Sequence, residues 1–190
     1  MPLPSFNALT LAHSFLSSHV KPGDLCIDAT AGRGRDTVFL CRLVGDSGRV
    51  LAYDIQKDAV HETAALLEKE HLSHIGQVFQ KSHDRMTEDA ELETVRAIVF
   101  NFGWLPGGDH NIFTRAQTSI RAIEQGLKLL APDGVMSLSI YYGKENGTSE
   151  RDALLSYLSS IDPKIATVLV GNFVNRKNNP AIPVFILKGV

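Results

Sequence analysis

The sequence predicts an α/β fold: one doubly wound, mostly parallel β-sheet with helices on both faces. Three observations support this prediction. Short apolar runs alternate with stretches of helical periodicity along most of the chain, a glycine-containing turn follows the first apolar run, and two apolar runs near the end are not separated by a helix. Strands separated by helices pair in parallel through right-handed crossovers, which places helices over both sheet faces.

The first elements can be assigned in order. Apolar residues from Leu9 to Val20 recur at helical spacing and predict an N-terminal helix, which a turn at 21–24 ends. The other periodic segments predict strands at 25–29, 49–53, 76–80, 97–102 and 135–141, with helices at 36–44, 57–71 and 112–130. A turn at 132–134 precedes the last of these strands, and a polar loop at 144–148 precedes a helix at 149–160.

The end of the chain predicts an antiparallel hairpin. Two apolar runs, 165–174 and 182–187, are joined only by the polar residues 175–179. Two strands without an intervening helix are typical of a hairpin, here at one edge of the sheet. A parallel sheet with such an ending resembles the Rossmann-like class I methyltransferase fold and differs from an ordinary dehydrogenase domain.

The composition is that of an ordinary globular protein, with 44% hydrophobic and 21% charged residues. We therefore expect a single domain over residues 1–190. No stretch approaches the roughly 20 apolar residues of a membrane span, so a cytoplasmic location is expected. The two cysteines and seven histidines lack metal-ligand spacing, so no metal is expected.

Residues 28–36 form a candidate nucleoside site. They close the first strand and open the first helix, where a doubly wound sheet binds its ligand, and Gly32 and Gly34 let the backbone approach closely. Asp54 ends the second strand 26 residues after Asp28, and a carboxylate there can accept hydrogen bonds from both ribose hydroxyls. The alternative is that both acids are only caps or turn residues.

Charge favours S-adenosylmethionine over a dinucleotide as the ligand. A dinucleotide brings a pyrophosphate, whereas S-adenosylmethionine brings a sulfonium and an ammonium, which suit Asp28 and Asp36. Arg33 in the same turn would instead suit a phosphate, and Asp36 is equally consistent with a plain first-turn helix residue. Ser82 and His83 follow the third strand, where they can hydrogen-bond or cover the adenine or simply be solvated.

The loop after the fourth strand, residues 101–110, is the candidate acceptor site. It resembles the Asn-Pro-Pro-Tyr-type loop of amine methyltransferases, with Asn101 accepting a hydrogen bond from the amine and Trp104 packing over it. Methyl transfer to nitrogen depends mainly on alignment and desolvation of a neutral amine. Asp109 or His110 would take a proton from an ammonium substrate. Core filling by Trp104 and strand-end capping by Asn101 are the alternatives.

Five segments together resemble the bacterial family known as rRNA methylases, which includes the MnmM-type tRNA enzyme acting on 5-aminomethyl-2-thiouridine at the wobble position. The resemblance covers nearly the whole chain and rests on residues 28–37, 53–56, 81–83, 101–109 and 177–180. It implies S-adenosylmethionine binding by Thr30, Gly32, Arg33, Gly34, Asp36, Asp54, Gln56, Ser82 and His83, with the acceptor near Asn101 and Trp104. The chain departs from the family pattern at Arg33, Arg35, Trp104 and Lys144.

A tRNA anticodon region is the partner that this resemblance implies. The net charge of −2 argues against gripping a long nucleic acid by charge alone, but an anticodon loop presents few phosphates and unstacked bases. The residues expected to contact it are Arg115, Tyr142, Lys144 and Lys177. Size and family suggest that a homodimer would widen the contact surface.

Several other functions remain open on the sequence alone. Another RNA, a small molecule or a protein amine would use the same donor residues. A nucleotide-dependent oxidoreductase fits poorly with the terminal hairpin and the loop at 101–109. A protein that binds S-adenosylmethionine without turnover would tolerate substitution of Asn101.

Overall fold

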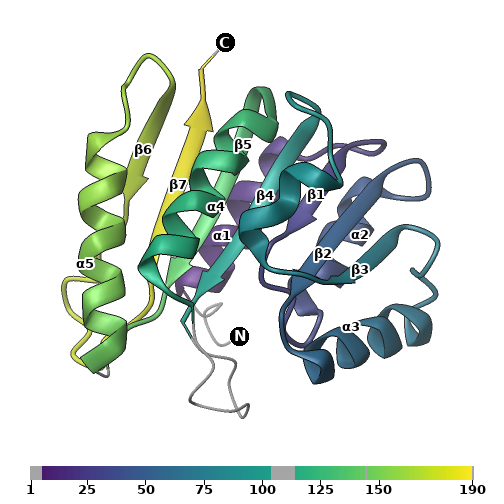
Figure 1. The fold of residues 1–190 in the computed structure, drawn as a ribbon, viewed down its shortest axis with the longest axis horizontal. Coiled ribbons are helices and arrows are strands. Elements are labelled where there is room, and N and C mark those ends of the chain that lie inside the picture. The colour runs from purple at the N-terminus through teal and green to yellow at the C-terminus, as the bar shows by residue number, and fades with distance from the viewer. Residues whose placement is uncertain (1–5, 104–113, 144, 190) are drawn as a thin grey trace.

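The computed structural model describes residues 6–103, 114–143 and 145–189. Within these ranges the strands form one seven-stranded sheet in the order β3-β2-β1-β4-β5-β7-β6 (Figure 1). The strand bounds are β1 Leu25–Asp28, β2 Arg49–Asp54, β3 Gly76–Gln80, β4 Val95–Phe102, β5 Leu130–Ile140, β6 Ala166–Val170 and β7 Ile182–Lys188.

The pairing confirms the predicted sheet. Strands β1 to β5 pair in parallel, whereas β7 is antiparallel to both β5 and β6. Strand β7 lies between β5 and β6, so β6 forms the sheet edge. The first residue of β7, Ile182, pairs with Ile140 at the end of β5. The segment before β7 therefore lies at the same end of the sheet as the carboxyl ends of the parallel strands.

Helices cover both faces because strand side chains alternate in direction. Phe100 belongs to the core cluster of Ile123 on one face, and Val99 to that of Leu16 and Leu40 on the other. Figure 1 shows α4 and α5 in front of the sheet and α1 and α2 behind it. The helices are α1 Ala8–His19, α2 Arg35–Val44, α3 Lys57–Lys69, α4 Ala116–Leu129 and α5 Glu145–Ser160, with a 3₁₀ helix η1 at His83–Glu88.

The predicted N-terminal helix is confirmed as α1, and a local motif explains where it begins. Asn7 accepts a hydrogen bond from the backbone N–H of Thr10, and the Thr10 hydroxyl accepts one from the Asn7 backbone. This reciprocal capping satisfies backbone donors that the first helical turn leaves unpaired. Buried Ala12 and Leu16 then face the sheet.

Three regions differ most from the prediction. The expected polar loop at 144–148 is wrong from Glu145 onward, because α5 already begins there. Strand β6 ends at Val170 rather than at 174, and Phe173 packs instead against Phe6. The turn expected at 132–134 lies inside β5 as a pairing irregularity, with Asp133 at φ 61°.

Candidate active site

The site lies where the strand order reverses, between the adjacent strands β1 and β4. Ligands of doubly wound sheets bind at the carboxyl ends of the strands at such a point. Between β1 and α2, Gly32 has φ 53° and Gly34 has φ 74°, both in the left-handed region. A Cβ on Gly34 would lie 3.0 Å from the Thr63 Cα on α3, so the turn is packed tightly against that helix.

Asp54 at the end of β2 holds this glycine turn. Its Oδ2 accepts a 3.0 Å hydrogen bond from the Gly32 backbone N–H, and its Oδ1 accepts a 2.9 Å bond from that of Gln56. A carboxylate oxygen can accept more than one hydrogen bond, so the half-buried Asp54 retains acceptor positions. Burial raises its pKa, and the backbone hydrogen bonds oppose that shift.

Asp28 lies beneath the same turn and is 0% exposed. It accepts a 2.6 Å bond from the Thr37 hydroxyl and a 3.2 Å bond from the Thr30 backbone N–H. Burial first, and then the charge of nearby Asp36, raise the pKa of Asp28 to about 7. The two hydrogen bonds link the Asp28 carboxyl group to the turn and to the first turn of α2, and its role toward the donor stays a prediction.

Asp36 and Asn101 meet across the gap between α2 and β4. The Asn101 side-chain Nδ2 donates a 2.8 Å hydrogen bond to Asp36 Oδ2, and the Asn101 backbone N–H donates a 2.7 Å bond to Thr30 Oγ1. The predicted donor turn and Asn101, the predicted acceptor-site residue, are thus hydrogen-bonded to each other.

His13 is a site residue that the sequence interpretation missed. Its Nε2 lies 2.7 Å from Asp36 Oδ1, and its ring stacks on Phe39 with centroids 3.7 Å apart and planes 6° from parallel. His13 lies on α1, 23 positions before Asp36. An isolated histidine on an amphipathic helix carries no local signal of this contact, which arises only when α1 packs against the sheet.

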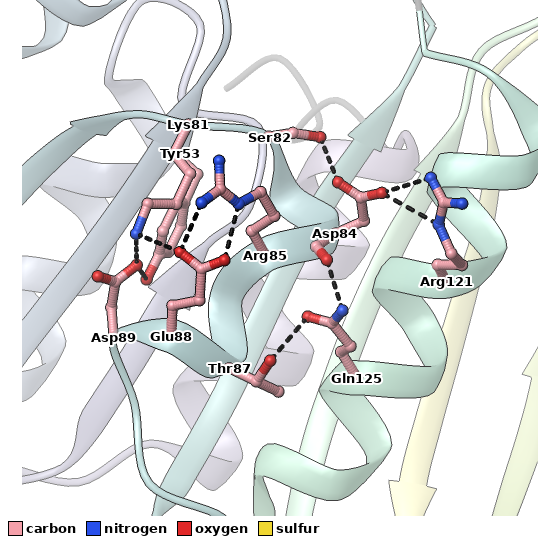
Figure 2. Close-up of polar contacts among 10 residues, drawn as sticks. All are labelled: Tyr53, Lys81, Ser82, Asp84, Arg85, Thr87, Glu88, Asp89, Arg121 and Gln125. Atoms are coloured by element: carbon pink, nitrogen blue, oxygen red, sulfur yellow. Dashed lines mark hydrogen bonds and ion pairs between the residues drawn. The ribbon is translucent and has the colours of Figure 1, made fainter.

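The segment after β3 is held firmly in place (Figure 2). Asp84 accepts a 2.6 Å bond from the Ser82 hydroxyl and bonds of 3.1 and 2.7 Å from Nε and Nη2 of Arg121 on α4. On the other side, Lys81 contacts Asp89 at 2.6 Å, and the Tyr53 hydroxyl donates to the same carboxylate at 3.2 Å. Contacts with Arg121 on α4 and with Tyr53 on β2 therefore fix the segment that carries Ser82 and His83.

His83 is half-buried, with its Nε2 atom enclosed, and is not simply solvated. Its ring meets Phe100 and Phe102 edge-on, and its Nε2 has no hydrogen-bond partner within the described part of the chain. Burial lowers the pKa of His83 to about 4, with Asp84 and a hydrogen bond to the Ala29 backbone acting in the opposite direction. An unpaired enclosed nitrogen is costly, and a ligand atom that bonds to it would remove this cost.

Glu150 on α5 is a second residue that the sequence interpretation missed. This 5% exposed carboxyl group accepts hydrogen bonds from the hydroxyls of Thr114 and Ser119, at 2.8 and 2.7 Å. Thr114 in turn accepts a 2.8 Å bond from the backbone N–H of Gly103 at the end of β4. Glu150 thus ties together the two described ends that flank residues 104–113, and burial raises its pKa.

The predicted acceptor and substrate residues are only partly described. Trp104, Asp109, His110 and Lys144 lie outside the described residues. Arg115 is exposed just before α4, and Lys177 is exposed in the segment before β7. Tyr142 is half-buried after β5, with the Arg151 guanidinium 4.8 Å above its ring.

The basic residues do not all gather in one cleft. Arg33 lies beside Glu62 on α3, with its Nε 3.5 Å from the carboxylate. Arg176 lies near Tyr142, with its guanidinium 4.5 Å from the Phe173 ring and a hydrogen bond to the Phe6 carbonyl. Tyr142, Phe173 and Arg176 line one small hollow beside the carboxyl end of β5.

Two features are absent from the described residues. No group of three or more His, Cys, Asp or Glu side chains in these ranges is arranged to hold a metal ion. No helix in the described part of the chain is both long and apolar enough to cross a membrane.

The chain is similar in sequence to known proteins. Residues 50–187 match the family model "Putative rRNA methylase". The chain is 33% identical to the chloroplastic tRNA (mnm(5)s(2)U34)-methyltransferase of Arabidopsis thaliana, across 95% of this chain and 69% of that protein.

Two solved structures are similar to this chain in fold and sequence. A "putative rRNA-methylase" from Clostridium thermocellum superposes with a TM-score of 0.95 at 38% identity, covering 98% of this chain and 100% of the other. A "putative methyltransferase" from Streptococcus mutans, solved with S-adenosylhomocysteine (SAH), has a TM-score of 0.88 and 32% identity, over 97% and 99% of the two chains.

Proposed function

We propose a substrate for this chain, which belongs to the "Putative rRNA methylase" family and is an S-adenosylmethionine-dependent methyltransferase. The proposed substrate is the aminomethyl group of 5-aminomethyl-2-thiouridine at the tRNA wobble position. The Arabidopsis relative is named as a tRNA (mnm(5)s(2)U34)-methyltransferase and aligns with nearly all of this chain, which supports that choice of substrate. The observation that carries the proposal is the hydrogen bond from Asn101 to Asp36, which joins an amine-type acceptor residue to the donor turn.

The residues around the turn fit S-adenosylmethionine. Asp54 retains acceptor positions for ribose hydroxyls, and the enclosed, unpaired Nε2 of half-buried His83 is suited to a polar atom of the adenine. The negative charge of the site suits a ligand with a sulfonium and an ammonium group. In this proposal the donor is bound by Thr30, Gly32, Gly34, Asp36, Asp54, Gln56, Ser82 and His83, with Asp28 supporting the turn from below and Arg33 at its outer rim.

Bound S-adenosylmethionine supplies an electrophilic methyl group on a sulfonium. The protein's task is to present a neutral amine in line with that methyl group and to exclude water. The Asn101 carbonyl oxygen accepts a hydrogen bond from the amine and so directs its lone pair toward the donor. We propose that Trp104 covers the amine, and that Asp109 or His110 takes the proton that the ammonium form must lose.

The surface beside the hollow at β5 supports an RNA substrate. Arg151 and Arg176 present guanidinium groups next to Tyr142 and Phe173, a combination that suits phosphates and stacked bases. Lys177 adds positive charge in the same segment. We propose that the anticodon loop lies across this surface and Arg115, with Lys144 contributing from outside the described residues. The homodimer suggested by family and size would extend this surface, and sedimentation of the purified protein tests it.

The test is methyl transfer from radiolabelled S-adenosylmethionine to bulk tRNA from a bacterial strain that lacks wobble methylation, followed by nucleoside analysis. Label in 5-methylaminomethyl-2-thiouridine supports the proposal. Label in another nucleoside, or only in small-molecule or protein amines offered in parallel, would overturn the substrate and leave the enzyme class intact.

A further inference from the structure

The side chains of His13, Asp36 and Asn101 form a continuous hydrogen-bonded chain at the carboxyl edge of the sheet. We propose that His13 and Asp36 are positioning residues, which hold the Asn101 carboxamide with its carbonyl oxygen turned toward the acceptor amine. This inference rests on the proposed amine substrate and assigns the N-terminal helix a role in the acceptor site.

The orientation of Asn101 follows from the chemistry of its partner. A carboxylate only accepts hydrogen bonds, so the amide end that faces Asp36 must be the NH₂ group, with Nδ2 and Oδ2 2.8 Å apart. The carbonyl end, Oδ1, is then directed elsewhere, and no donor among the described residues bonds to it. The bond from the Asn101 backbone to Thr30 fixes the peptide from which this side chain projects. Asn101 thus presents an acceptor, which suits an amine N–H.

His13 fixes Asp36 in turn. The Asp36 side chain is only 12% exposed, and its two oxygens bond to different partners, Oδ1 to His13 and Oδ2 to Asn101. Rotation of the carboxylate would break both bonds. The stack of His13 on Phe39 holds the imidazole ring in its plane, and α1 itself packs on β5 and β7. A shift of α1 would therefore be transmitted to Asn101 through two short contacts.

A purely structural role predicts different behaviour. If the His13 to Asp36 contact only anchored α1, its loss would lower stability and all activities together. A positioning role instead predicts lower turnover with donor affinity and stability nearly unchanged. Asp36 is unsuitable for this distinction because it is also a proposed donor-binding residue. His13 is suitable because it is not a proposed donor-binding residue, and the polar contact of its side chain within the described residues is with Asp36.

The experiment compares three variants. His13→Phe keeps a ring to stack on Phe39 but removes the donor, whereas His13→Gln restores an N–H near the position of Nε2. His19→Phe is the matched control, since His19 lies on the same helix and bonds to Phe15 within it. We measure turnover on undermethylated tRNA, SAH affinity by calorimetry and the thermal midpoint.

We expect His13→Phe to lower kcat by about tenfold or more, with SAH affinity within about twofold of the parent, because an alignment effect acts on the transition state. We expect His13→Gln to recover most of the loss and His19→Phe to show none. Unchanged kcat in His13→Phe, or a loss that His13→Gln does not restore, would overturn the proposal.

A second measurement does not depend on the substrate. The side-chain NH₂ signals of Asn101 in ¹⁵N NMR spectra report whether the carboxamide is held. Slow hydrogen exchange in the parent that becomes fast in His13→Phe supports the positioning role, and equal exchange in both contradicts it. If the parent protein methylates no tRNA, the proposed function fails, while this measurement still decides the role of His13.

Discussion

The hydroxyl oxygen of Thr30 accepts a 2.7 Å hydrogen bond from the backbone N–H of Asn101, 71 positions further along the chain. This bond joins the turn after β1 to the end of β4, so the donor and acceptor parts of the site are held in one frame. The side chains that carry the chemistry therefore depend on a bond between two strands that are distant in sequence.

Replacing Thr30 with Val should destabilise the protein. The substitution leaves the Asn101 N–H without its partner in a partly buried position, which costs about 1 to 3 kcal/mol. Thr30→Ser keeps the hydroxyl and should cost less. Urea denaturation of both variants measures the difference, and equal stability of the two would show that the bond contributes little.

Asp54→Asn should weaken donor binding by more than about tenfold, or ~1.4 kcal/mol. The amide keeps one acceptor oxygen but loses the charge and the second acceptor that the ribose hydroxyls would use. Calorimetric titration with SAH measures this, with the exposed Asp58→Asn in the first turn of α3 as control. Equal affinity of the Asp54 variant and the parent would remove the ribose assignment.

The free energy of unfolding should depend on the protonation of Asp28. Its pKa is raised from 3.8 to about 7 in the folded protein, so between these values the folded state binds more protons than the unfolded state. Stability from this group is fully present below the unfolded pKa and is lost as the pH rises toward and through 7. Denaturation between pH 4 and 8 should show a smaller decline in Asp28→Asn than in the parent, and parallel curves would contradict the assignment.

Glu150→Ala should lower both stability and turnover. It removes the acceptor for the hydroxyls of half-buried Thr114 and buried Ser119, at a cost of about 1 to 3 kcal/mol. Thr114 also bonds to Gly103, so the loss extends to the end of β4, which carries Asn101. Glu150→Gln keeps one acceptor and should lie between alanine and the parent. Turnover unchanged in Glu150→Ala would separate α5 from the acceptor site.

The parts of the site that could be predicted from sequence are those with local signals. Asp28 and Asp54 end apolar runs, and Gly32 and Gly34 occupy a turn that needs positive φ values. Both signals can be recognised from the order of residue types along the chain. Parallel pairing then brings the strand ends to one edge without further information. The predicted sheet is therefore confirmed, and the structure brings the glycine turn and Asn101 into hydrogen-bond contact.

His13 and Glu150 could not be predicted in this way, because their roles depend on how helices pack. His13 reaches Asp36 only when α1 lies against the sheet, and Glu150 reaches Thr114 only when α5 lies beside α4. Neither residue has a neighbour in sequence that marks it as functional. The insertion of β7 between β5 and β6 is likewise set by tertiary pairing, since the two apolar runs alone indicate only a hairpin.

The most direct test of the account is Asn101→Ala, with donor affinity and methyl transfer measured on the same preparation. Asn101 is proposed to act on the acceptor amine, so we expect SAH affinity within about twofold of the parent and single-turnover methyl transfer to undermethylated tRNA reduced by about a hundredfold. Equal losses in donor affinity and transfer rate, or a transfer rate that does not change, would contradict the placement of the acceptor beside Asn101.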